Sequence, residues 1–356
     1  MLSLQGLRAD ILKGCWYVVA RGTAIKPGRM IVTRLAGEPI VVARGESGDV
    51  FALRDTCPHR GIPLHYGRIL GNSLECSYHG WRFDPDGACV EIPSLHEGQQ
   101  IDIGKIRCPK FPAIERYGLV WLYLPQTSEA PAAGRMPEPP ALPEIPFDAA
   151  PQISVEMDFP SSIDHSVFSL MDLTHAPYVH KMRWFKTQPT KLRPKEKVFE
   201  PAPFGFRMKR HRVPPQNVMY HRLVGGNAST EISYMLPAYR IEHISSDRHW
   251  AVALTAHTPL DEDFTMVHQC FWSSIPWLAA VAPIARCLVR VFLGQDRHYV
   301  ALQREGLMSK PRLMLINDAD TQVRWWMRIK DDWKIAQANN KPFLNALNTQ
   351  TLRWRS

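Results

Sequence analysis

The chain has 356 residues, 45% of them hydrophobic, 10% aromatic and 22% charged, and this balance excludes wholesale disorder. The length is sufficient for two domains that each bury a core. The formal net charge of +9 suits an acidic protein partner or an anionic membrane surface. The Lys and Arg residues are scattered and no nucleic-acid-binding motif occurs, so we expect no nucleic acid among the partners.

The cysteines and the N-terminus indicate the compartment. Two of the seven cysteines, Cys57 and Cys76, belong to a motif described below, and the other five are dispersed and odd in number. This pattern is typical of free thiols in a reducing environment. Residues 1–10 lack the long apolar core that follows a basic region in a secretory signal. We therefore expect a cytoplasmic protein.

Short strands separated by turns predict a small all-β domain in the N-terminal third of the chain. Aromatic and β-branched residues predict the strands, and glycines at 45 and 48 predict a hairpin between the second and the third of them. The expected strands are residues 14–20, 39–44, 50–53 and 117–124.

Two short loops in this region carry metal-binding residue types. Cys57-Pro-His59 and Cys76-Ser-Tyr-His79 each contain one thiol and one imidazole, and 16 residues between His59 and Cys76 allow a hairpin to bring the loops together. Two Cys and two His could hold a tetrahedral zinc ion. Zinc fingers of that composition pair Cys with Cys and His with His, however. Mixed loops suit a [2Fe-2S] cluster in which two thiolates hold one iron and two imidazoles hold the other.

The flanking residues carry a family resemblance. Cys57-Pro-His-Arg-Gly61 and Cys76-Ser-Tyr-His-Gly-Trp81 closely resemble the Rieske domain of the Rieske non-haem iron oxygenases. The resemblance implies that Cys57, His59, Cys76 and His79 bind one Rieske [2Fe-2S] cluster. Neutral imidazole ligands raise the potential of such a cluster above that of an all-cysteine ferredoxin.

A proline-rich segment, residues 126–151, predicts a linker. With this linker as the boundary, the resemblance implies a Rieske domain over residues 1–125 and a catalytic domain with a mononuclear non-haem iron over residues 152–356.

Residues 169–180 contain Asp172, His175 and His180. If the segment up to His175 is helical, Asp172 and His175 share a face, and Pro177 then breaks the helix before His180. Neighbouring histidines alone are more often structural. Two imidazoles and a carboxylate on one side of a metal, however, are the facial arrangement of non-haem Fe(II) oxygenases.

This segment also resembles the family pattern, in which an aspartate precedes the first ligand histidine by three residues and a second histidine follows five later. The resemblance implies that His175 and His180 bind a mononuclear Fe(II) and that Asp172 is the catalytic residue that links this iron to a cluster. Many members have Asn where this chain has Ser169. His165 is expected beside the iron or in the pocket wall, and not as a ligand.

The third iron ligand should be a carboxylate far along the chain. Residues 291–303 resemble the late helix of the family, in which an acidic pair begins a run that ends in Gln. Gln295 replaces the first acid, so Asp296 is the expected ligand. Asp318 and Asp320 are the alternatives, which could equally cap a helix. His298 lies close in sequence and is not expected to bind the metal.

Four consecutive strand patterns without helical periods between them predict an antiparallel sheet. With helices before and after it, this sheet gives an α+β protein, and the resemblance implies a helix-grip domain, a curved sheet around a long helix. The resemblance extends from about residue 14 to 305. The expected strands are residues 230–236, 239–243, 250–257 and 265–272.

Residues 275–293 are nearly apolar and about as long as a membrane-spanning helix. Pro283, Arg286 and Arg290 argue against spanning. We expect either a buried helix packed on the sheet or a hydrophobic surface that contacts the inner face of a membrane peripherally.

The resemblance implies a terminal oxygenase that works as a head-to-tail homotrimer on O2 and a hydrophobic substrate, by monooxygenation or dioxygenation. Electrons from NAD(P)H would arrive through a separate ferredoxin or flavin reductase, since no Gly-X-Gly-X-X-Gly fingerprint occurs. The layout resembles the branch that hydroxylates or demethylates aromatic acids and ethers. A steroid or polycyclic lipid is the alternative substrate, and an electron carrier with a non-catalytic ligand-binding domain is the alternative function.

Overall fold

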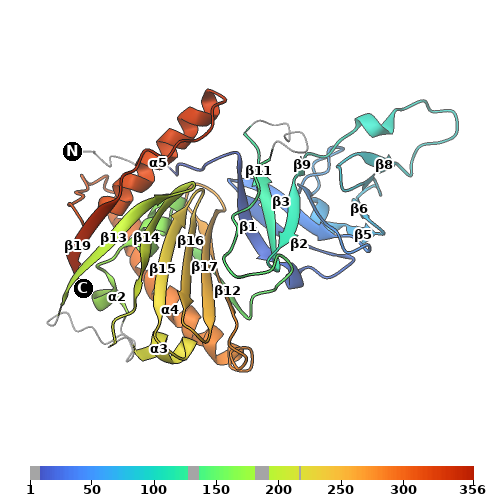
Figure 1. The fold of residues 1–356 in the computed structure, drawn as a ribbon. Helices are drawn as coiled ribbons and strands as arrows, with labels where there is room; N and C mark the ends of the chain where they lie inside the picture. Colours follow the sequence, from blue (N-terminus) through green and yellow to red (C-terminus); the bar gives the residue numbers. More distant parts are fainter. Residues whose placement is uncertain (1–8, 127–135, 181–191, 216–217) are drawn as a thin grey trace.

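The N-terminal part of the chain consists of short antiparallel strands in three small sheets. In the computed structural model (Figure 1), residues 9–126, 136–180, 192–215 and 218–356 are described. One sheet contains β1 (Cys15–Arg21), β11 (Leu119–Leu124) and β10 (Ala113–Arg116). The second contains β2 (Arg29–Leu35), β3 (Glu38–Arg44), β4 (Val50–Arg54) and β9 (Lys110–Phe111). The third contains β5 (Arg68–Leu70), β6 (Ser73–Glu75), β7 (Arg82–Phe83) and β8 (Cys89–Glu91).

The strands expected in this part are present. Three 3₁₀ turns, η1 (Gly22–Ala24), η2 (Leu64–Tyr66) and η3 (Ile103–Lys105), lie between them. The last expected strand begins two residues late, at Leu119, because Tyr117 and Gly118 have φ of 56° and 66° and form a turn. The all-β character predicted for this part is confirmed.

The expected linker is only partly an open connection. Residues 127–135 lie outside the described residues, and residues 136–151 contain no helix or strand. Leu142 and Ile145 are nevertheless buried, and Trp16 Nε1 donates a hydrogen bond to the Pro137 carbonyl at 2.6 Å. This stretch is therefore packed between the two halves of the molecule, and the domain boundaries remain predictions.

The second half is an antiparallel eight-stranded sheet in the order β12-β18-β17-β16-β15-β14-β13-β19. The four expected strands are β15 (Ser229–Met235), β16 (Tyr239–Ser245), β17 (Trp250–Pro259) and β18 (Thr265–Ser273). The others are β12 (Ile153–Phe159), β13 (Pro194–Ala202), β14 (Gly205–Arg212) and β19 (Gln350–Arg355).

The two faces of this sheet have different neighbours. Trp272, Leu254 and Tyr239 share a buried cluster with Trp121 and Trp16 of β11 and β1, so one face packs on the N-terminal half. Helices cover the other face, which we call the helix-covered face; Figure 1 shows α4 passing behind the sheet. The α+β, helix-grip prediction is confirmed. The helices are α1 (Ile163–Met171), α2 (Ala176–Val179), α3 (Val218–Val224), α4 (Ala282–Leu307) and α5 (Thr321–Ala338).

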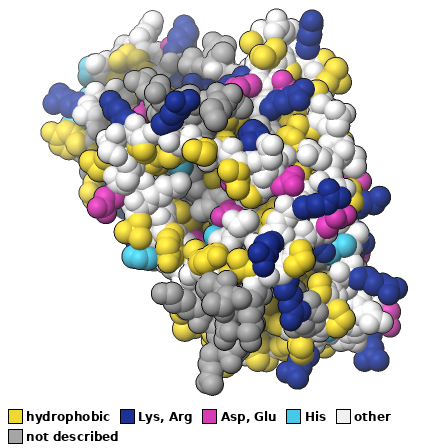
Figure 2. Space-filling model, turned by 90° about the vertical axis from the view of Figure 1, so that its left-hand side faces the viewer, with side chains coloured by type: hydrophobic (Ala, Val, Ile, Leu, Met, Phe, Trp, Pro, Cys, Tyr) yellow, Lys and Arg dark blue, Asp and Glu magenta, His cyan; other side chains and the backbone are white. Residues whose placement is uncertain are grey.

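The apolar stretch 275–293 is not one buried helix. Helix α4 begins only at Ala282, after a turn at residues 276–281. Leu293 is buried, whereas Ile284 and Val291 are 67% and 48% exposed. None of the described helices has the length and apolar character that crossing a bilayer requires. On the face shown in Figure 2, Lys and Arg side chains are spread among hydrophobic ones.

Candidate metal centres

The two Cys/His loops fold alike. The Cys57 N–H donates to the Ile62 carbonyl and the Cys76 N–H to the Trp81 carbonyl, both at 2.8 Å. Each loop then turns through a glycine four residues after its cysteine, with φ of 75° and 71° at positions 61 and 80. A residue without Cβ adopts that conformation at little cost. The repeated Cys-X-X-X-Gly pattern therefore gives two matched loops.

The cysteines and histidines of these loops differ in solvent exposure. Cys57 and Cys76 are buried, whereas the imidazoles of His59 and His79 are partly exposed, with ring centroids 4.6 Å apart. Burial, and secondarily the neighbouring Cys76 thiol, raises the pKa of Cys57 to about 11. Two adjacent buried thiols of this kind suit metal binding, in which the ion displaces their protons. Trp81 stacks on His59 at 4.3 Å and holds its ring.

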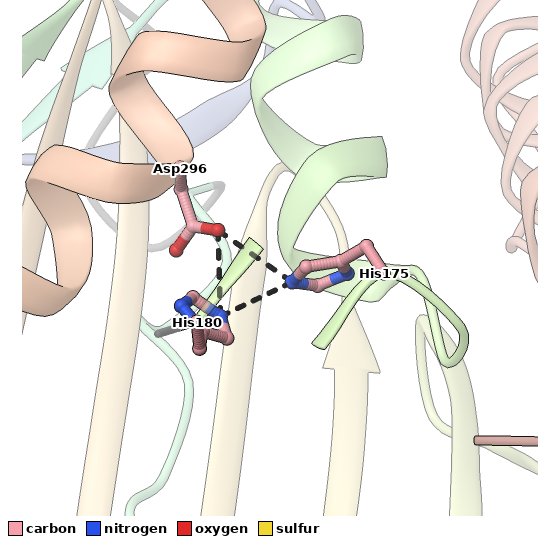
Figure 3. A group of neighbouring side chains, drawn as sticks. All are labelled: His175, His180 and Asp296. Atoms are coloured by element: carbon pink, nitrogen blue, oxygen red, sulfur yellow. Dashed lines mark hydrogen bonds and ion pairs between the residues drawn. The ribbon is translucent and has the colours of Figure 1, made fainter. Parts of the chain in front are cut away.

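Three side chains from distant segments meet in the second half of the molecule (Figure 3). His175 Nε2 lies 3.3 Å from His180 Nε2, and the Asp296 Oδ1 atom lies 3.5 Å and 3.6 Å from these two nitrogens. Two atoms that each lie about 2.1 Å from one ion are at most about 4.2 Å apart. Asp296 is buried, and its Oδ2 has no hydrogen-bond partner among the described residues. The three side chains therefore fit a metal ion.

The surroundings fix the orientation of both imidazoles. The His180 Nδ1 atom lies 3.1 Å from Gln295 Oε1. The amide oxygen can only accept a hydrogen bond, so Nδ1 carries the proton of the neutral imidazole. The unprotonated Nε2 atom then faces His175 Nε2 and Asp296 Oδ1. Phe292 stacks on the same ring at 3.9 Å. The sequence did not predict that Phe292 and Gln295 contact His180, because both contacts depend on how α4 docks.

Among the candidate iron ligands, Asp172 contacts His175. The His175 Nδ1 atom lies 3.1 Å from the Asp172 carbonyl and 3.6 Å from its Oδ2. Burial lowers the pKa of His175, but the carboxylates of Asp172 and Asp296 outweigh burial and raise this pKa to about 9. Burial would raise the pKa of Asp172, yet hydrogen bonds from His175 and Thr174 lower it. The Asp172 Oδ1 atom accepts from Thr174 N at 2.6 Å and from its Oγ1 at 2.8 Å.

The helical path expected for this segment is wrong. Helix α1 ends at Met171, and Asp172 takes an extended conformation with φ −60° and ψ 128°. Pro177 does not break a helix. It stands in the first turn of α2, where its missing N–H costs nothing. His175 and His180 flank α2 at its two ends, so one short turn brings their rings together.

The other sequence candidates lie apart from the three ligands. His165 is buried and its Nδ1 lies 3.0 Å from Ser162 Oγ, and Ser169 Oγ donates to the Ser166 carbonyl. The Asp320 Oδ2 atom accepts from the Ile316 N–H. His298 is exposed on α4. Asp320, one of the two alternatives to Asp296, therefore has a local structural contact, and neither it nor Asp318 joins the group of His175, His180 and Asp296 among the described residues.

Comparison with known proteins matches both halves of the chain to domain families. The Rieske [2Fe-2S] domain family matches residues 15–112, and the vanillate O-demethylase oxygenase C-terminal domain family matches residues 167–332. The iron-sulfur subunit of the toluene-4-sulfonate monooxygenase system of Comamonas testosteroni is 33% identical over 172 residues, 48% of this chain and 46% of that protein. Chlorophyllide a oxygenase of Arabidopsis thaliana is 30% identical over 177 residues, 49% of this chain and 30% of that protein.

Solved structures share the fold. Dicamba monooxygenase bound to dicamba superposes with a TM-score of 0.70 at 21% identity, over 93% of this chain and all of that one. NdmA of Pseudomonas putida with caffeine superposes with a TM-score of 0.68 at 20% identity, over 91% of both chains. With its Rieske domain and its oxygenase C-terminal domain, the chain belongs to the Rieske non-haem iron oxygenases. The matches span less than half the length of the relatives compared above.

Proposed function

We propose that the chain is the terminal component of a multicomponent oxygenase, which uses O2 and externally supplied electrons to hydroxylate an aromatic or other hydrophobic ring substrate. Hydroxylation of a methyl group would lead to demethylation. The observation that carries this proposal is the meeting of His175, His180 and Asp296 within 3.6 Å of one another, in a chain that also carries the Cys/His loops.

Each residue has a role in this proposal. Cys57, Cys76, His59 and His79 would hold the cluster, and His175, His180 and Asp296 would hold Fe(II) and leave one side open to substrate. When bound, the cluster stores an electron and the mononuclear iron activates oxygen. Asp172 holds His175 through Nδ1, and Gln295 holds His180 in the same way. These two contacts would keep both Nε2 atoms directed at a bound ion.

Electrons would come from NAD(P)H through a ferredoxin, a flavin reductase or both. Partly exposed imidazoles at the tips of the Cys/His loops and a 36% exposed Asp172 side chain support transfer between neighbouring subunits. We therefore propose a head-to-tail homotrimer in which His59 or His79 of one subunit faces Asp172 of the next. A cytoplasmic location remains part of this proposal.

A steroid or polycyclic lipid is the second substrate class. Trp277, Ile284 and Val291 are exposed, and Arg290 lies among them on α4, which suits peripheral contact with an anionic membrane. The 4beta-methylsterol monooxygenase of Methylococcus capsulatus is 37% identical over 108 residues, 29% of that protein.

The test uses purified protein with a surrogate reductase, NADH and labelled O2. Methoxylated and methylated aromatics are supplied beside sterols, and products are read by mass spectrometry. We expect label in the product alcohol or formaldehyde from an aromatic ether. Iron analysis separates the electron-carrier alternative, because an oxygenase needs about three irons for every two inorganic sulfides and a carrier about two. About two irons for every two sulfides, with no labelled product, would contradict the proposal.

A further inference from the structure

A row of polar side chains crosses the helix-covered face of the eight-stranded sheet. Tyr234, Arg240, Thr255 and Gln269 are directly opposite one another on β15, β16, β17 and β18, and we call them the polar row. Residues in such register point to the same face. The Thr255 hydroxyl donates to Gln269 Oε1 at 2.7 Å. Covered sheet faces are ordinarily apolar, so a continuous polar row requires a reason.

The polar row lies between the segments that carry the candidate iron ligands. On one side, helix α1, which ends immediately before Asp172, packs on β17, where Ser166 Oγ lies 2.8 Å from Nδ1 of His257, two residues after Thr255. On the other side, Gln269 pairs with Val155, which shares a cluster with Leu293, three residues before Asp296. The row therefore lies on the sheet face covered by α1 and α4, the helices that border the proposed iron site.

The charge of Arg240 is neutralised by Glu242, two residues further along β16 and on the same face of the sheet. Arg240 Nη2 lies 2.8 Å from Glu242 Oε2. The Glu242 Oε1 atom accepts hydrogen bonds from the Tyr220 hydroxyl at 3.0 Å and from the Thr230 hydroxyl at 3.4 Å. Both oxygens of this buried carboxylate are thus occupied. Arg240 has five N–H donors, and 22% of its side chain remains accessible although it lies on a covered face.

We propose that the polar row binds a neutral oxygen of the substrate, a carbonyl or hydroxyl group on an apolar ring skeleton, and that Glu242 sets this preference against carboxylates. The inference rests on the proposed function and names its substrate class. Arg240 donates to the substrate oxygen, and Thr255 and Gln269 lie beside it. A substrate carboxylate would meet an arginine whose charge Glu242 already neutralises, and it would be repelled by that carboxylate.

The test compares matched probes that differ only in this group. Para-methoxyacetophenone and para-methoxybenzoate are the one-ring pair, and a ketosteroid and its carboxylic acid analogue are the four-ring pair. Binding is measured by equilibrium dialysis on the fully loaded protein without reductase. We expect the wild type to bind the ketone of a pair at least about tenfold more tightly, the effect of one hydrogen bond to a charged group.

Variants separate the polar row from a general effect of charge. Glu242→Gln keeps the shape but frees the charge of Arg240, so the ratio of ketone to carboxylate affinity should fall at least about tenfold. Arg240→Met should weaken ketone binding, and Arg240→Lys should restore part of it. Glu200→Gln is the matched control, because Glu200 pairs with Arg207 at 2.7 Å on the opposite face of the same sheet. Thermal unfolding shows that each variant is folded.

The inference is overturned if the wild type prefers the carboxylate. It is also overturned if Glu242→Gln and Glu200→Gln have the same ratio of ketone to carboxylate affinity. Turnover on any substrate in that case leaves the proposed function standing. The ketone preference and its loss in Glu242→Gln, without labelled product from any substrate, would instead support the polar row and contradict the oxygenase.

Discussion

The two candidate metal centres differ in how far apart their residues lie in the sequence. All four cluster residues lie within residues 57–79, and each loop closes on its own backbone through matched hydrogen bonds. The iron residues span 175–296 and meet only because α4 docks against α1 and β12. A local centre depends on its turns, whereas a dispersed centre depends on the whole fold. The second should therefore be the more sensitive to distant change.

The largest expected effect comes from removing the buried carboxylate of the dispersed centre. Asp296→Ala should lose the mononuclear iron and all measurable turnover, while the cluster keeps its visible spectrum, because the loops share no residue with this site. Iron and sulfide analysis should give a ratio near that of an isolated cluster. His298→Ala, on the same helix but exposed, is the control. Loss of the cluster spectrum in Asp296→Ala would mean that the centres are not independent.

Asp172→Asn tests the residue through which electrons would pass from the cluster of one subunit to the iron of the next. The amide oxygen can still accept from Thr174, so the segment should keep its path. The negative charge beside His175 disappears, and we expect turnover to fall about 100-fold with both centres loaded. Single-turnover kinetics and metal content are the measurements. Normal oxygenation would remove Asp172 from the electron path.

Gln295→Leu tests the amide contact that orients His180. The imidazole loses its hydrogen-bond acceptor, and Fe(II) affinity should fall about tenfold, measured by competition with a chelator. Gln295→Glu, which keeps an acceptor, should retain tight binding. Equal losses in both variants would show that the contact itself has no orienting role.

The smallest expected effect tests the local centre through its turn. Gly61 has a φ of +75° and open space around its missing Cβ, so Gly61→Ala should cost only the strain of that conformation, about 1 kcal/mol of unfolding free energy. Denaturant unfolding of the loaded protein measures this cost. Gly104→Ala, where φ is not positive, is the control. An unchanged stability in Gly61→Ala would mean that the loop has another accessible path.

The proposed local centre follows almost entirely from sequence, because Cys57, His59, Cys76 and His79 suggest it by residue type and spacing. Asp296 required the family resemblance, since no local pattern connects it with His175. The role of Gln295 could not be predicted, because its amide reaches His180 only after α4 docks. The end of α1 at Met171 was also missed, because Pro177 suggested the wrong break. Pairing of β19 with β13 joins segments about 150 residues apart, beyond any periodic signal.

The shared cluster between the two halves has a consequence for engineering. Trp16 and Trp121 from the N-terminal half pack with Leu254 and Trp272 from the eight-stranded sheet, and the Tyr239 hydroxyl donates to the Trp16 carbonyl. Each half therefore completes the hydrophobic core of the other. A chimera that exchanges the N-terminal half between relatives must therefore carry complementary residues on β16, β17 and β18 to keep this core filled.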